Sequence, residues 1–140
     1  MARKISIPDF RPHKEGFRQV LGDLEADIME YIWAHGSSTV RAVHGHLNEE
    51  RELAYTTVMT VMTRLAEKEL LLREQVGNAY AYVPAVSREA FAEQVVAEVL
   101  DALMGNFGDQ TVSHFARQIA QVDEDRLAKL QEAVQRKRGR

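Results

Sequence analysis

The sequence predicts a mainly α-helical protein that contains one small β-hairpin. Three observations lead to this fold class. Apolar residues within Ala54–Lys68 recur at the spacing of a helix with one buried stripe. Within Leu70–Val83 the period changes to that of a strand, around a Gly77-Asn78 turn. After Pro84 the helical period returns, so helices should also make up the C-terminal part.

The N-terminal part predicts two helices before Ala54–Lys68. The first begins with Asp23 as its N-cap and ends at Gly36, a glycine suited to the left-handed conformation. A short second helix runs from about Thr39 to Leu47, and a polar turn at residues 48–53 follows. A helix, a short helix, a tight connection and a longer helix form a helix-turn-helix arrangement.

The helix Ala54–Lys68 has an unusual outer side. A face that meets only water usually carries Glu, Lys and Gln, because Thr loses rotamer freedom in a helix. Short hydroxyl and methyl groups suit the DNA major groove, where they meet base edges, phosphates and thymine methyl groups. The helix alone equally suits a Thr-rich core helix of an α/β domain, so its neighbours must decide. The outer side holds Thr56, Thr57, Met59, Thr60, Thr63 and Arg64.

The predicted hairpin favours the DNA-binding interpretation of this helix. Its strands are Leu70–Val76 and Ala79–Val83, and Pro84 ends the second. A hairpin directly after a recognition helix is a wing, and the combination is far more specific than either part. We therefore predict a winged helix-turn-helix DNA-binding domain at residues 21–86.

Residues 87–136 predict a three-helix dimerisation domain. Ser87 and Asp123 are N-caps, and a Gly-rich break at residues 105–108 divides the first two helices, which end near Met104 and Gln121. Three amphipathic helices are a thin core for one chain, so we expect them to pack against a second copy. A dimer would also present two recognition helices to two half-sites. The predicted dimerisation residues are Phe91, Val95, Val99, Leu103, Val112, Phe115, Ile119, Leu127 and Leu130.

The composition excludes several classes of protein and of site. Nearly half of the 140 residues are hydrophobic, which allows a core, and there is no cysteine, which excludes disulfides and thiolate metal sites. No membrane span or signal peptide is evident, so we expect a cytoplasmic protein without membrane insertion. The net charge is −3, but both ends are basic: residues 1–20 form a predicted extended or partly ordered arm, and residues 137–140 form a tail.

Four blocks of the sequence resemble the penicillinase-repressor (BlaI/MecI) family. The resemblance runs from about Leu21 to Leu130, and Ala54–Leu65 is its most specific part. It implies a cytoplasmic winged-helix repressor that is dimeric through its C-terminal helices and binds a palindromic operator. The blocks are Leu21–Glu25, Thr39–His44, Ala54–Leu65 and Tyr80–Arg88.

The resemblance also implies a means of release. In the best-known members, which silence β-lactam resistance genes, a membrane sensor with a zinc-peptidase domain triggers cleavage of the repressor. The corresponding position here is His114-Phe115, where the family has asparagine before the phenylalanine. The histidine opens the alternative of another release signal. The copper-responsive branch of the family needs a cysteine-rich metal site, which this chain lacks.

Two other departures lead to expectations. Glu69 stands where the family often has glycine after the recognition helix, so we expect the exit of that helix to be shaped differently. Around the wing turn, Arg73 is the lone cation where the family usually carries several. We expect the basic arm at residues 1–18 to supply cations to DNA in their place, with Arg3, Lys4, Arg11, Lys14 and Arg18.

The predicted DNA contacts combine base readout and phosphate contacts. We expect the hydroxyls of Thr56, Thr57 and Thr60 to contact base edges and Met59 to contact a thymine methyl. Tyr55 should lie in the core. Arg64 is a phosphate anchor or a partner of Glu67 or Glu69. His44 and His46 point opposite ways on a helix and predict no metal site. The predicted DNA-contacting residues are Arg41, Thr56, Thr57, Met59, Thr60, Arg64, Arg73 and Asn78.

These patterns predict a transcriptional repressor that binds operator DNA as a homodimer, at β-lactam-resistance or stress genes. The alternatives are a winged-helix sensor whose C-terminal helices bind an effector, and a winged-helix module that binds only protein. No nucleophile with its base, phosphate-binding loop or paired carboxylates indicates an enzyme or a cofactor.

Overall fold

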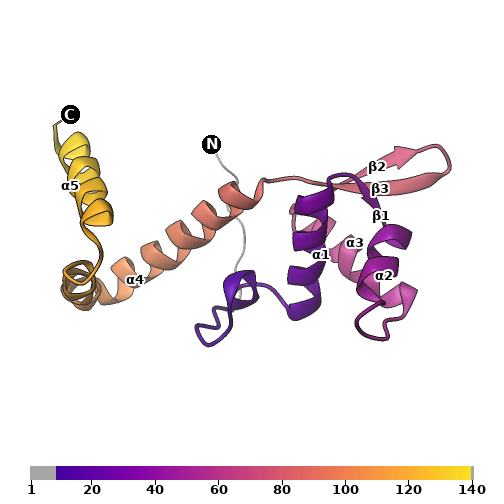
Figure 1. Ribbon diagram of the computed structural model, residues 1–140, viewed down its shortest axis with the longest axis horizontal. Coiled ribbons are helices and arrows are strands. Elements are labelled where there is room, and N and C mark those ends of the chain that lie inside the picture. Colours follow the sequence, from indigo (N-terminus) through magenta and orange to yellow (C-terminus); the bar gives the residue numbers. More distant parts are fainter. Residues whose placement is uncertain (1–8, 140) are drawn as a thin grey trace. The chain divides into compact units, whose positions relative to one another are not determined.

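A computed structural model describes residues 9–139 of the chain (Figure 1). Contacts divide the chain into two compact units, residues 1–97 and residues 98–140. Helices dominate and the strands form one small antiparallel sheet, which confirms the predicted fold class. The elements are η1 (Gly16–Gln19), α1 (Asp23–His35), β1 (Ser38–Thr39), α2 (Val40–Leu47), α3 (Tyr55–Glu67), β2 (Leu71–Val76), β3 (Ala79–Pro84), α4 (Arg88–Ile119) and α5 (Glu124–Arg138).

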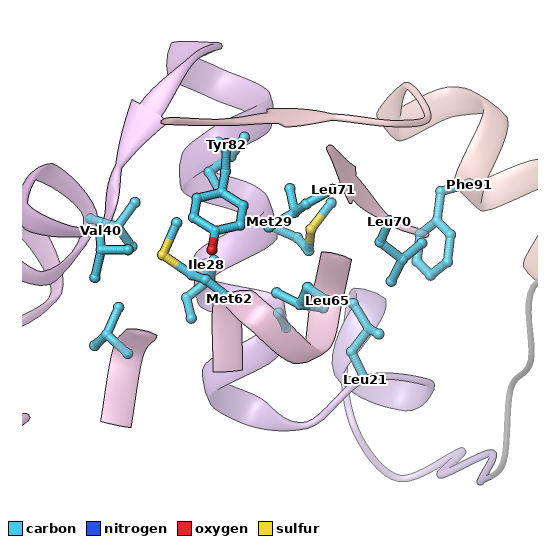
Figure 2. Close-up of a cluster of buried hydrophobic side chains, with 14 of the residues drawn as sticks. Leu21, Ile28, Met29, Val40, Met62, Leu65, Leu70, Leu71, Tyr82 and Phe91 are labelled. Atoms are coloured by element: carbon cyan, nitrogen blue, oxygen red, sulfur yellow. The ribbon is translucent and has the colours of Figure 1, made fainter. Parts of the chain in front are cut away.

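The core of the N-terminal unit lies between α1, α3 and the sheet (Figure 2). Ile28 and Ile32 of α1 and Met62 and Leu65 of α3 are fully buried, and Tyr82 of β3 joins them. Burial of such an aliphatic side chain contributes roughly 1.5–3 kcal/mol. Because α3 buries this stripe, its opposite side points out of the unit.

The sheet has the order β1-β3-β2, with both pairs antiparallel. Arg73 of β2 lies opposite Tyr82, and Gly77 takes a φ of 61° in the predicted turn. On the other side of β3, Ser38 of β1 pairs with Tyr82. The sequence did not predict β1, because two residues show no period and Ser37-Ser38 resembles a loop.

The ends of α1 and α3 combine expected and unexpected features. Gly36 ends α1 with the predicted positive φ, 76°. The N-cap of α1 is Gly22, one residue before the predicted Asp23. After α3, Glu69 has a φ of 66°, so the left-handed turn that suits glycine forms here with glutamate. The expected difference from the family at this exit stays a prediction, and a left-handed conformation costs a non-glycine residue about 1–2 kcal/mol.

Residues 9–20 fold back on α1 instead of extending as an arm. They include η1, and they end at Val20 and Leu21, which are buried. Phe17 packs against the same core. Backbone and aromatic contacts hold this segment, so hydrophobic periodicity could not reveal it. Arg3 and Lys4 of the predicted arm lie outside the described residues.

The C-terminal helices begin where the sequence predicted. Ser87 Oγ accepts a hydrogen bond from Ala90 N–H at 3.0 Å, and Asp123 Oδ1 accepts one from Arg126 N–H at 2.8 Å. The predicted break at residues 105–108 is confirmed within α4: Phe107 has a non-helical φ of −138° and ψ of 46°, and this kink separates two helical parts. Within residues 9–139, no helix combines the length and the apolar character needed to cross a bilayer.

Candidate nucleic-acid interface

The outer face of α3 is the candidate site. Val58, Met62 and Leu65 are buried on one side of the helix. This burial fixes the helix about its axis and turns the opposite side to the outside. Met59 remains 41% exposed there, although it is one of the largest apolar side chains of the helix. The outer face consists of Thr56, Thr57, Met59, Thr60 and Arg64, all of them exposed.

The hydroxyls of this face are not equivalent. Thr60 Oγ1 donates to the carbonyl oxygen of Thr56 at 2.8 Å, so its lone pairs remain as acceptors. Thr63 Oγ1 donates in the same way to the carbonyl of Met59, at 2.9 Å, but Thr63 is half-buried. The Thr60 hydroxyl can therefore accept from a base amino group, and Thr63 serves as an internal reference.

The N-terminal end of α3 carries a residue that the sequence analysis misplaced. Tyr55 was expected in the core but is 45% exposed, with its ring edge-on to His44 at 5.7 Å between centroids. It lies in the first turn of α3, where the apolar stripe has reached the edge of the core. The His44 ring is fixed in turn, because Nε2 lies 2.7 Å from the carbonyl of Leu53. Tyr55 thus borders the outer face beside Ala54, an N-cap that forms no side-chain hydrogen bond.

The cations around this face are exposed. Arg41 and Arg64 take part in none of the ion pairs found between residues 9 and 139. Both guanidinium groups can therefore meet an anion without breaking any of these ion pairs.

The wing presents one cation that an aromatic ring holds. The guanidinium carbon of Arg73 lies 4.4 Å from the centre of the Tyr80 ring, within the range of a cation–π contact. Tyr80 is 50% exposed, whereas Tyr82 on the same strand is buried. Asn78 is exposed in the turn, so both predicted wing contacts are accessible.

An ion pair ties the end of α3 to α1. Lys68 Nζ donates to Glu25 Oε2 at 2.7 Å, and Gly22 N–H donates to Glu25 Oε1 at 2.8 Å. Burial of the Glu25 carboxyl acts to raise its pKa. The two hydrogen bonds and the charges of Lys68 and Arg11 outweigh burial, and the pKa is lowered from its ordinary value of 4.5. The ionised carboxylate thus helps to fix the outer face in place.

The two histidines of α2 have structural neighbours. The His46 ring is tilted against that of Tyr31, with 4.8 Å between centroids, and lies 6.2 Å from the ring of His35, while His44 faces Leu53. In the described part of the chain, no group of three histidine or carboxylate side chains is arranged to hold a metal ion.

Two of the predicted dimerisation residues need correction, because they pack against the core of the N-terminal unit. The half-buried Val95 packs against the core cluster. Phe91 is only 1% exposed and packs against Phe17 and Trp33 of the same unit. Its position on the apolar stripe of α4 gave no sign of this, because the contact comes from a distant segment. Leu103, Val112 and Phe115 are exposed, and Val95, Val99, Ile119, Leu127 and Leu130 are half-buried.

The region that corresponds to the family cleavage position is also accessible. His114 and Phe115 are both exposed in α4, and His114 Nε2 lies 3.4 Å from Gln118 Nε2. Both residues line an open hollow of about 800 Å³ together with Leu100, Leu103 and Phe107.

Comparison with known proteins gives a consistent family. The family model described as penicillinase repressor matches residues 21–136. The transcriptional regulator BlaI of Mycobacterium tuberculosis, in two strains, is 45% identical over 84 residues, which are 59% of this chain and 59% of that protein. The penicillinase repressor of Staphylococcus aureus is 26% identical over 93 residues, 66% of this chain and 74% of that protein.

A solved structure gives a further likeness. It is the solution structure of the DNA-binding domain of the repressor BlaI, 26% identical, with a TM-score of 0.45. The likeness covers 53% of this chain and 89% of that one. The matched part of this chain thus spans about three fifths of the mycobacterial relatives and most of the isolated domain.

Proposed function

The chain belongs to the penicillinase repressor family, and from this premise we propose that it is a transcriptional repressor that binds a palindromic operator in double-stranded DNA as a homodimer. One observation carries the proposal. The outer face of α3 presents Thr56, Thr57 and Thr60 to the outside, on a helix whose other side is held in the core. This surface has the size and chemistry that a major groove accepts.

Each residue of the interface has a proposed role. Thr56, Thr57 and Thr60 contact base edges, with the Thr60 hydroxyl as an acceptor, and Met59 contacts a thymine methyl. Arg41 and Arg64 contact phosphates on either side of the groove. Arg73 and Asn78 do the same from the wing. With so few cations, this interface should gain less from counterion release than a strongly basic one.

The C-terminal unit supports a dimer. Side chains that a soluble monomer would cover remain largely exposed there, among them Phe107 at 58% and Phe115 at 51%. A second copy of the same helices offers a matching surface, and a symmetric pair explains why one chain exposes a continuous apolar face. The paired molecule would present two α3 helices to two half-sites about one helical turn apart.

Release from DNA is the finer part of the proposal. Cleavage between His114 and Phe115, triggered directly or indirectly by a membrane sensor peptidase, would cut α4 within the apolar face and so weaken the dimer. The two side chains are exposed in the single chain, but the bond lies within a helix, which must open locally before a peptidase can bind it.

The α3 proposal is tested by removing the hydroxyls. DNA fragments that the full-length protein prefers are selected from random sequence, and binding is compared with that to an unrelated fragment. The triple variant Thr56→Ala, Thr57→Ala, Thr60→Ala should lose about tenfold or more of this preference, because each lost base contact costs about 1–3 kcal/mol. Binding to the unrelated fragment should hardly change, since phosphate contacts remain.

Thr63→Ala is the matched control. It removes a hydroxyl from the same helix, but one that is half-buried and bonded to the carbonyl of Met59. Its DNA preference should stay close to that of the wild type. If the folded triple variant selects its fragment as well as Thr63→Ala does, α3 is not the reading surface and the proposal fails.

A further inference from the structure

The segment before α1 joins α1 to the first turn of α4. The Phe17 ring lies 5.1 Å from the ring of Trp33 in α1 and 5.0 Å from that of Phe91 in α4. The guanidinium of Arg88 covers the Phe17 ring at 5.0 Å, and its Nε donates to Glu30 Oε1 of α1 at 2.9 Å. Phe17 is thus enclosed by both helices and by a salt bridge between them.

A further hydrogen bond fixes the approach to α4. Trp33 Nε1 donates to the carbonyl of Val86 at 2.9 Å, just before the N-cap of α4. The start of α4 is therefore attached to α1 by an aromatic cluster, an ion pair and a backbone contact. All three attachments lie within the N-terminal unit.

The segment is itself held in a defined shape. The Arg11 guanidinium donates to the carbonyls of Arg18 and Leu21, and Arg11 N–H donates to the carbonyl of Gln19 at 2.7 Å. We call residues 11–21 the strap. These contacts close it into a loop that presents Phe17 to the helices.

The charges of the strap are used within the molecule. Arg18 pairs with Asp27 and lies 3.6 Å from Asp23, and Lys14 lies 3.9 Å from Asp23. These side chains are partly covered by α1 and do not form a free cationic arm. The expectation that Arg11, Lys14 and Arg18 supply phosphate contacts is therefore replaced by a different role for this segment.

We propose that Phe17 is a positioning residue for operator recognition: it holds the first turn of α4 against α1, and so makes the dimer selective for the spacing between half-sites. The inference rests on the proposed function. Phe91 and Arg88 both lie in this first turn and both contact Phe17. A first turn that is free to tilt would let the two DNA-binding units of a dimer adopt more than one separation, whereas a change of one base pair alters the half-site spacing by only about 3.4 Å.

The test compares Phe17→Ala with Phe10→Ala in the full-length protein. Phe10 lies in the same segment but is 45% exposed, so its removal should leave the strap in place. The chain contains one tryptophan, Trp33, whose fluorescence reports the cluster without DNA. Phe17→Ala should shift the Trp33 emission to longer wavelength and increase quenching by acrylamide, whereas Phe10→Ala should change neither.

The DNA measurement then separates positioning from simple stability. The probe is a palindromic fragment selected by the wild type, with its half-sites moved closer or further apart by one base pair. The wild type and Phe10→Ala should lose about tenfold or more in affinity for the altered spacings, and Phe17→Ala only about twofold. Arg88→Ala, which opens the cluster without a core cavity, should give an intermediate loss and replaces Phe17→Ala if that variant does not fold.

The outcomes are distinct. If Trp33 reports a released strap while the spacing preference stays that of the wild type, Phe17 does not position the DNA-binding unit and the inference is overturned. If the wild type selects no palindromic fragment, the proposed function fails, and this inference fails with it. A smaller spacing preference in Phe17→Ala, with the wild-type preference for half-site sequence retained, supports it.

Discussion

The two units of the chain differ in what they bury. In the N-terminal unit, α1, α3 and the sheet enclose a core that includes Ile32, Met62 and Phe91. Among the described residues, no side chain after Phe91 is buried. The first unit therefore contains its own core within one chain, while the helices of the second leave their apolar sides open. The winged helix thus has its core within one chain, whereas the C-terminal helices expose apolar side chains that the proposed dimer would cover.

This difference leads to different responses to concentration. A core within one chain gives a stability that does not depend on how much protein is present. A surface completed by a second copy gains stability as concentration rises, by mass action. The proposed homodimer can thus be broken without unfolding the winged helix.

The largest expected effect follows from placing a charge on the open face. Leu103→Asp and Phe115→Asp each replace an exposed apolar side chain, which lines the hollow of the C-terminal unit, by a carboxylate. In a dimer this charge would be buried without a partner, so self-association should weaken by about 100-fold or more. Sedimentation velocity over a range of concentrations measures the change.

Ala102→Asp provides the comparison for that experiment. Ala102 is exposed on the same helix next to Leu103, but it does not line the hollow. It adds the same charge and should leave most of the self-association intact. If all three variants sediment like the wild type, the open face is not the dimer interface, and the contrast between the two units has another origin.

The same contrast explains which features the sequence could predict. Val58, Met62 and Leu65 of α3 recur at the three- and four-residue spacing of one helix face, so their spacing predicted both the helix and its outer face. Phe91 has the same spacing within α4, yet its partner Phe17 lies more than seventy residues earlier in the chain. Periodicity reports which side of a helix is apolar but not what covers it, and so Phe91 was assigned to the wrong surface.

Two further misses have a similar cause. The strap carries few apolar residues, and hydrogen bonds from one guanidinium to backbone carbonyls hold it. Such contacts leave no trace in composition or spacing. Tyr55 was placed in the core because it continues the stripe of α3, but the stripe extends one turn beyond the elements that cover it. The ends of elements are where the period is least informative.

A smaller effect is expected from the Glu25–Lys68 ion pair, which stabilises the N-terminal unit. Glu25 has a lowered pKa, so its ionised form stabilises the fold at pH values above the ordinary value of 4.5. The contribution is lost as pH falls through the lower pKa of the folded state. At pH 7, Glu25→Gln should reduce the free energy of unfolding by about 1 kcal/mol, because Glu25 is only 18% exposed but its partner Lys68 is 42% exposed, so that solvent weakens the pair. The difference from the wild type, measured by urea unfolding, should shrink towards zero as pH falls below the lowered pKa of Glu25.

Glu30→Gln is the matched control for this pH dependence. Glu30 also pairs with a cation, Arg88, but both side chains are about half exposed, at 45% and 52%. Its replacement should change the free energy of unfolding by a few tenths of a kcal/mol, with little dependence on pH. Equal effects of both substitutions at all pH values would mean that Glu25 stabilises the unit through its shape and not its charge.

The smallest expected effect concerns the turn after α3, where the well-packed unit contains local strain. Glu69 takes a φ of 66°, which glycine adopts without a Cβ clash. Glu69→Gly should therefore have a free energy of unfolding up to about 1 kcal/mol higher than that of Glu69→Ala, since relief of the clash exceeds the entropy that glycine adds to the unfolded chain. Glu69→Ala loses the same side chain but keeps Cβ, so the difference between the two variants isolates the backbone contribution. If Glu69→Gly is no more stable than Glu69→Ala in urea unfolding, the left-handed turn is not strained, and the exit of α3 is held in this shape at no cost to the fold.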